Sequence, residues 1–290
     1  MAAIKLLDGG VSLGLIVFSR AFLFLPLLLV WLHNRGRLRA SLKTSDPLGH
    51  IIRGLIGGMG MLVWFSAIQR LPLPSAQAIA FAGPLMAVVL AILLLGEKVY
   101  AFRWSAVTIG FVGIVILLSE HLTGQGAAET AGAVLALIFA LLSALASIQI
   151  RRLTGSESTE TIVIYFSYVT TVFGLMLLPF GWEMPNGRET LLLVFIGIAG
   201  GAAQIMLTQA LRHCEASILA PFEYFSMIWV TIMGFVLFGD IPTITTTAGS
   251  VIIIAAGTAV ILRERYLHRR VNRARGNSEI GSKPEDQQLP

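Results

Sequence analysis

The sequence has few charged residues and a single cysteine for its length. Charged side chains make up 13% of the 290 residues, whereas a soluble domain carries about 25%. So small a charged fraction cannot cover a water-facing surface, which argues against soluble enzymes, nucleic-acid binders and disordered regulators. Cys214 has no cysteine partner, so an internal disulfide is excluded. The five histidines are scattered and no Gly-Lys-Ser/Thr follows a glycine loop, so we expect no metal, no cofactor, no ATP-driven pump and no enzyme.

Long apolar runs take the place of the missing charge. Hydrophobic residues make up 56% of the chain, and the mean hydropathy is +0.80. A helix needs about 20 apolar residues to cross a hydrocarbon core of roughly 30 Å. Continuous runs of this length predict an all-α integral membrane protein with about nine visible transmembrane helices, at residues 11–32, 48–68, 74–95, 103–119, 131–150, 162–181, 190–210, 216–238 and 243–262. Residues 263–290 are polar and basic, which predicts a disordered tail.

The positive charges fall on one side of these predicted spans. The connections after the first, third, fifth and seventh spans, together with the tail, hold most of the Lys and Arg residues. The other side has only Lys5, Arg70 and Arg188. The positive-inside rule therefore predicts that the tail lies in the cytoplasm, near anionic lipid headgroups. Nine spans then put the N-terminus outside, which is also what a protein lacking its first helix would show.

Two segments of the chain share a layout at a shift of 143 residues. Residues 67–97 and 210–240 each pass from an Ala-aliphatic pair through a polar turn and an apolar span to a glycine and an acid. The two copies are predicted to run in opposite directions, as inverted repeats of secondary transporters do. Any two apolar helix pairs also look alike, which is the alternative. The repeat divides the chain into 1–119 and 131–262, and predicts a ten-helix (5+5) inverted-repeat bundle without its first helix.

Several short motifs support a family resemblance. They include Phe18-Ser19-Arg20, Ile52-Arg53-Gly54, Ala82-Gly83-Pro84, Leu95-Gly96-Glu97-Lys98 and Ala220-Pro221. On these residues the chain resembles the EamA-type carriers of the drug/metabolite transporter superfamily, over residues 5–265. Within it, the layout is similar to the subgroup that includes S-adenosylmethionine uptake carriers, with some riboflavin carriers similar.

The resemblance implies a secondary transporter. Such a carrier moves a small metabolite across the cytoplasmic membrane by alternating access through a central cavity, and the substrate would be S-adenosylmethionine-like or riboflavin-like. A coupling ion is compatible with this function, and such carriers work as monomers or homodimers. The alternative is a non-transporting or truncated membrane protein derived from such a carrier.

Charged residues within the predicted spans are the first candidates for a binding site. Arg20 lies about ten residues into its span, where an unpartnered charge costs at least about 2.5 kcal/mol. It either contacts substrate in the cavity or is capped by backbone carbonyls of a neighbouring helix. Glu223 follows Ala220-Pro221, and either serves a cationic group or proton, or pairs with a cytoplasmic arginine. Arg53 lies nearer the cytoplasmic end of its span, from which we expect its side chain to reach the interface.

Aromatic and amide residues within the spans complete the candidate set. Trp64, Phe81, Tyr168 and Tyr224 offer rings for stacking on a flat substrate. Gln204 offers an amide in the same cavity, while other in-span polar residues such as Gln77 and Ser143 are expected to form helix–helix hydrogen bonds. The predicted substrate-binding set is Arg20, Trp64, Phe81, Tyr168, Gln204, Glu223 and Tyr224.

Overall fold

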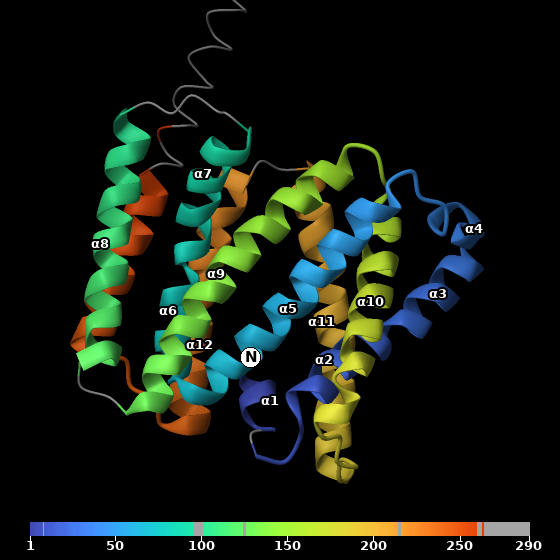
Figure 1. Cartoon of the computed structure of the whole chain (residues 1–290), viewed down its shortest axis with the longest axis horizontal. Coiled ribbons are helices and arrows are strands. Elements are labelled where there is room, and N and C mark those ends of the chain that lie inside the picture. The colour runs from blue at the N-terminus through green and yellow to red at the C-terminus, as the bar shows by residue number, and fades with distance from the viewer. Residues whose placement is uncertain (8, 96–100, 124–125, 214–215, 260–262, 264–290) are drawn as a thin grey trace, which may run out of the picture.

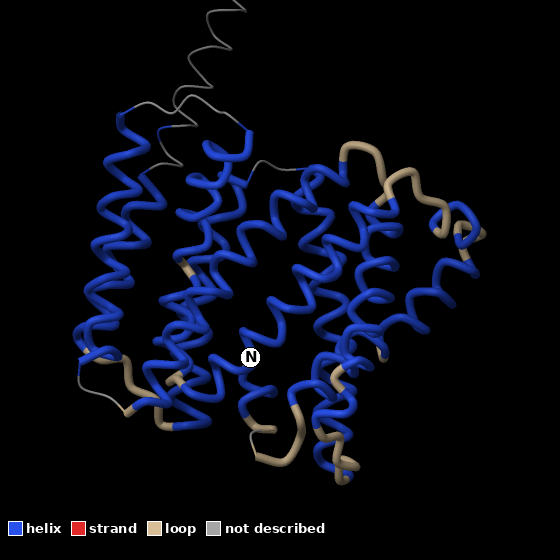
Figure 2. The backbone as a smooth tube through the Cα atoms, viewed as in Figure 1, coloured by secondary structure: helices blue, strands red, loops and turns tan. Residues whose placement is uncertain are grey.

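The fold is a bundle of helices, seen in a computed structural model (Figure 1). The structure describes residues 1–7, 9–95, 101–123, 126–213, 216–259 and 263. Across these residues the secondary structure is helical, without a strand (Figure 2). Among the described residues, six helical segments are long and apolar enough to cross a membrane, and three shorter apolar helices accompany them. These nine segments correspond to the nine predicted spans, and the prediction of an all-α membrane protein is confirmed.

The helices follow one another with short connections. The first seven are α1 (Ala2–Lys5), α2 (Leu13–Phe22), α3 (Phe24–Asn34), α4 (Leu38–Ser41), α5 (Pro47–Arg70), α6 (Leu73–Ala80) and α7 (Ala82–Leu95). After them come α8 (Ala101–Thr123), α9 (Ala127–Thr154), α10 (Thr159–Met176), the short 3₁₀ helix η1 (Leu178–Phe180), α11 (Gly187–His213) and α12 (Ala216–Phe238). A last described helix covers Ile244–Ala259.

Side chains with short polar groups start several of these helices. The Ser12 hydroxyl accepts a hydrogen bond from the Leu15 N–H at the start of α2. Asp46 does the same for Gly49 at the start of α5, with Pro47 in the first helical turn. These are the residue types that satisfy the free N–H groups of a helix N-terminus.

Two of the spans are interrupted near a proline. α2 and α3 form one span with a break at Leu23, and α6 and α7 form another with a break at Phe81. Pro26 and Pro84 each follow the break by three residues. A proline has no N–H to donate, and its ring crowds the carbonyl four residues earlier, so a helix breaks about one turn before it. The second break places Phe81 beside the candidate site described below.

Segments from the two halves of the sequence pack against each other. α9 contacts α5, α6 and α7, whereas α10 and α11 both contact α2. Glycines allow some of these close approaches: a Cβ on Gly174 would come within 2.8 Å of the Phe18 Cα, and one on Gly201 would overlap the Phe24 ring. The buried hydrophobic core therefore runs through both halves.

The bundle has two ends with different charged residues. One end, called here the basic end, holds Arg37, Arg152 and Arg212, which contact Glu160, Asp46 and the Glu157 backbone. The opposite end holds Lys5 and Asp240. The Leu73 N–H at the start of α6 donates to Asp240, which follows the end of α12. The α6–α7 segment and α12 therefore run in opposite directions (Figure 1).

Candidate functional site

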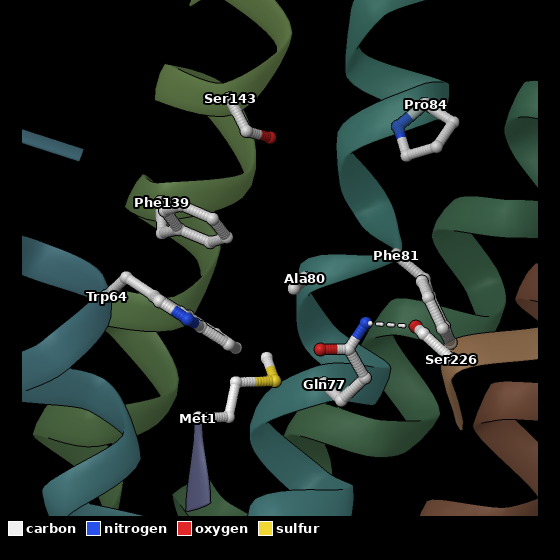
Figure 3. A pocket seen from close by; sticks show the side chains of 9 residues that line it. All are labelled: Met1, Trp64, Gln77, Ala80, Phe81, Pro84, Phe139, Ser143 and Ser226. Carbon is white, nitrogen blue, oxygen red and sulfur yellow. Dashed lines mark hydrogen bonds between the residues drawn. The ribbon is translucent and has the colours of Figure 1, made fainter. Parts of the chain in front are cut away.

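A pocket of about 340 Å³ lies between α5, α6, α7, α9 and α12. This volume is within the range of small-molecule sites. The lining is mostly apolar with a few polar groups (Figure 3). The lining residues are Met1, Trp64, Gln77, Ala80, Phe81, Pro84, Phe139, Ser143 and Ser226.

Two stacked rings form one wall of this pocket. Trp64 of α5 and Phe139 of α9 lie with ring centroids 4.5 Å apart and planes 25° apart. Both helices are held at this contact by close packing, and Trp64 is buried. Phe81, which is also buried, lies at the break between α6 and α7. Fixed aromatic surfaces of this kind suit a flat ring, because offset stacking requires little adjustment of the protein.

Gln77 is the main polar group of the pocket. Its Nε2 donates to the Ser226 hydroxyl of α12 over 3.2 Å. Its Oε1 is buried and has no hydrogen-bond partner among the described residues. Figure 3 shows this oxygen directed away from Ser226, toward Met1 and Trp64. A buried carbonyl without a donor costs about 1–3 kcal/mol, so this oxygen is an available acceptor for an N–H or O–H of a ligand.

Arg20 lies in the interior but does not line this pocket. Its guanidinium carbon is 5.9 Å from the centroid of the Phe65 ring, the residue after Trp64. On its other side a Cβ on Gly200 of α11 would come within 2.6 Å of the Arg20 Nε, so the glycine gives the side chain room. Arg20 therefore occupies the space between α2, α5 and α11.

The remaining predicted site residues lie in different places. Trp64 and Phe81 line the pocket, and Gln204 is buried on α11, 3.5 Å from the Thr208 hydroxyl. Tyr168 is 59% exposed on α10, outside the pocket lining. The side chains of Glu223 and Tyr224 lie outside the described residues.

Seven of the nine lining residues were not in the predicted binding set, and three of them, Gln77, Phe139 and Ser226, contribute the ring stacking and the hydrogen bond described above. Gln77 forms the expected helix–helix hydrogen bond and still presents an unpaired oxygen. Its position in an apolar span, seven residues before Pro84, was the available sequence signal. Ser226 offered the same signal, a polar residue within an apolar span. Phe139 offered no signal, because the apolar pattern around it does not show which face of the helix points inward.

Arg53 lies near the end of its span, as predicted, but the prediction that its side chain reaches the interface is wrong. This side chain is 4% exposed, and its guanidinium carbon lies 4.3 Å from the centroid of the Phe166 ring of α10. α10 packs across the basic-end half of α5 and covers the path along which the arginine would reach the interface.

At the basic end, a buried carboxylate is surrounded by hydrogen-bond donors. Glu157, between α9 and α10, is buried, and its Oε1 accepts hydrogen bonds from the Ser45 N–H at 2.7 Å, the Thr44 hydroxyl at 2.8 Å and the Ser45 hydroxyl at 2.9 Å. A longer bond comes from the Asp46 N–H. Burial alone would raise the pKa of Glu157, but these hydrogen bonds outweigh it and hold the pKa below its usual value.

The opposite end has a second charged network. Asp240 Oδ2 accepts from Lys5 Nζ and from the Leu73 N–H, both at 2.9 Å. Lys5 also donates to the Leu71 carbonyl at 2.9 Å. In the described part of the chain, no three His, Cys, Asp or Glu residues come together as metal ligands.

Comparison with known proteins identifies the family. The family model of the EamA-like transporter family matches residues 2–119 and 130–263. This chain belongs to the EamA-like transporter family. An S-adenosylmethionine uptake transporter of Rickettsia felis is 31% identical over 251 residues, which cover 86% of this EamA-like transporter and 83% of the relative.

Two further comparisons agree with this membership. A riboflavin transporter of Vibrio cholerae is 30% identical over 236 residues, covering 80% of this chain and 78% of the relative. A solved crystal structure, 21% identical in sequence, matches this transporter with a TM-score of 0.68 over 92% of both chains. At that identity the structural match shows the fold alone.

Proposed function

We propose that this EamA-like transporter is a secondary carrier that moves a small metabolite with a planar ring across the cytoplasmic membrane. The observation that supports this proposal most is the pocket with stacked Trp64 and Phe139 beside the unpaired Gln77 oxygen. Adenine and flavin rings both have a flat face for stacking and an N–H that donates to a carbonyl. Relatives named for S-adenosylmethionine and for riboflavin carry compounds with such rings.

The two charged ends suggest how such a carrier would work. In this proposal the basic end faces the cytoplasm, because arginine-rich connections remain on that side of the membrane. The Lys5–Asp240 network closes one end and the Glu157 network the other. Alternating access would loosen one network while the other stays closed. Coupling to an ion gradient and exchange are both compatible with this scheme.

Binding of ring compounds to the purified protein tests the proposal. We expect S-adenosylmethionine or riboflavin to raise the midpoint of thermal unfolding, since a ligand at a hundred times its Kd stabilises the folded state by about 2.7 kcal/mol. Trp64→Leu should weaken binding about tenfold, because a ring-stacking contact is worth about 0.5–1.5 kcal/mol and the ring also buries apolar area. Trp104→Leu is the matched control, since Trp104 is exposed on α8.

Gln77 provides a second arm of the same test. Gln77→Leu removes the unpaired acceptor, and we expect a loss of ligand affinity without a comparable loss of unfolding midpoint. Gln209→Leu is the control, because Gln209 is exposed on α11. Equal binding by the Trp64 and Trp104 variants would contradict the proposed site. No stabilisation of the unmodified protein by any ring compound would contradict the proposed substrate class.

A further inference from the structure

Two arginines, Arg20 and Arg53, lie inside the bundle. Arg20 is half-buried, and Arg53 lies one helical turn along α5 from His50 of the basic end. Arg53 of α5 is 4% exposed, and its Nε and Nη1 atoms have no hydrogen-bond partner in the described part of the chain. Arg20 of α2 lies over the Phe65 ring of α5.

The Arg53 guanidinium is held in a defined orientation. One face lies against the Phe166 ring at 4.3 Å from its centroid. Gly57, one turn further along α5, leaves room for the group, because a Cβ at that position would overlap both Arg53 Nη1 and the Phe166 ring. Phe166 and Gly57 therefore fix the plane of the guanidinium and leave its Nε and Nη1 donors unused.

These interior charges differ from those at the ends. The described ion pairs, Lys5–Asp240, Arg37–Glu160, His50–Glu157 and Arg152–Asp46, all lie at one of the two ends. Neither Arg20 nor Arg53 has an acidic partner among the residues that the structure describes. A buried charge without a counter-charge is strongly unfavourable. An anionic group on a ligand would supply the missing counter-charge, and the guanidinium fork suits an oxyanion.

We propose that Arg20 and Arg53 form an anion-binding subsite on the transport path, and that the carried metabolite has a carboxylate or phosphate group in addition to its ring. This inference rests on the proposed function. Arg20 lies beside Phe65, the neighbour of the pocket residue Trp64. Arg53 precedes Trp64 by 11 residues on α5, which is about 16 Å along the helix toward the basic end. Arg20 meets the anion while the ring is in the pocket, and Arg53 receives it as the metabolite moves toward the basic end.

Matched ligand pairs test this subsite in the purified full chain. One pair is riboflavin and riboflavin 5′-phosphate; the other is S-adenosylmethionine and its decarboxylated analogue. The ring is the same within each pair and only one member has the oxyanion. In the unmodified protein we expect the oxyanion member of at least one pair to bind about tenfold or more tightly than its partner, as charge-assisted hydrogen bonds provide. The phosphate and carboxylate pairs distinguish the two kinds of anion.

Three variants test which residues cause the tighter binding of the oxyanion member. With the ring in the pocket, Arg20→Gln should remove most of the preference for the oxyanion member, and Arg53→Gln should lower this preference to a smaller extent. Both variants should leave the affinity for the oxyanion-free member unchanged. Arg188→Gln is the control for loss of one positive charge, because Arg188 is exposed at the start of α11. It should retain the full preference. Equal affinity for both members in the unmodified protein would overturn the subsite but leave the ring pocket standing.

Two measurements that use no ring compound test the anion subsite independently of the proposed function. At constant ionic strength, acetate or phosphate should raise the unfolding midpoint of the unmodified protein but not of the Arg53→Gln variant. This result would support the subsite even if no ring compound bound, whereas its absence would overturn the subsite. Without ligand, Arg53→Gln should keep or raise the midpoint, because it removes an unpaired buried charge. A lower midpoint would indicate a structural arginine and contradict the proposal.

Discussion

Charged groups at the ends of the bundle and charged groups in its interior have opposite environments. At the basic end, the Glu157 carboxylate receives hydrogen bonds from three successive residues, 44–46. In the interior, Arg53 is equally buried, yet its Nε and Nη1 have no partner in the part of the chain that the structure describes. From this difference we infer that the end networks hold the fold together, and we propose that the interior arginines bind a ligand.

The first prediction tests the structural role of Glu157. Glu157→Leu leaves the Ser45 N–H and two hydroxyls without an acceptor, so we expect a loss of about 3 kcal/mol in the free energy of unfolding. The measurement is unfolding in detergent. Glu160→Leu is the control, because its partner Arg37 is 64% exposed and an exposed ion pair contributes less than about 1 kcal/mol. Equal losses in both variants would mean that the Glu157 network has no special structural role.

A smaller effect is expected at the opposite end. Asp240→Asn removes the charge that pairs with Lys5 but leaves an oxygen that can accept from the Leu73 N–H. We expect a loss of about 1 kcal/mol in unfolding free energy, measured in the same way. A loss as large as that of Glu157→Leu would show that the two ends are fixed equally firmly.

The smallest predicted effect is on the pH dependence of the stability. The pKa of Glu157 is lowered in the folded protein from its usual value of 4.5. Its stabilising contribution is therefore fully present above pH 4.5 and is lost as the pH falls through the lower folded-state value. Thermal unfolding followed from pH 4.5 downward through that lower value should show a smaller loss of stability in Glu157→Gln than in the unmodified protein. Identical pH profiles would contradict the lowered pKa.

The sequence alone predicted the spans better than the site. Apolar length identifies a membrane helix whatever its neighbours are, so the nine spans could be placed directly. Trp64 and Phe81, which line the pocket, were predicted because aromatic residues within spans are natural candidates for stacking. The helix breaks at Leu23 and Phe81 follow from Pro26 and Pro84, which are visible in the sequence.

The parts that could not be predicted depend on helix rotation and on contacts between distant segments. Phe139 faces the pocket because of how α9 packs on α5, which the uniformly apolar sequence does not encode. Arg53 was expected at the interface, but α10 covers it, and its position relative to α10 is a tertiary property. The same holds for Lys5 and Asp240, which are 235 residues apart in sequence.

Counterflow in proteoliposomes tests the central claim most directly, namely that the pocket beside Trp64 and Gln77 binds the carried metabolite. Vesicles loaded with unlabelled S-adenosylmethionine or riboflavin would receive the labelled compound outside. We predict saturable accumulation of at least one compound, reduced about tenfold in Trp64→Leu and unchanged in Trp104→Leu. Accumulation in Trp64→Leu equal to that of the unmodified protein, or no more accumulation than in empty vesicles for both compounds, would contradict the account.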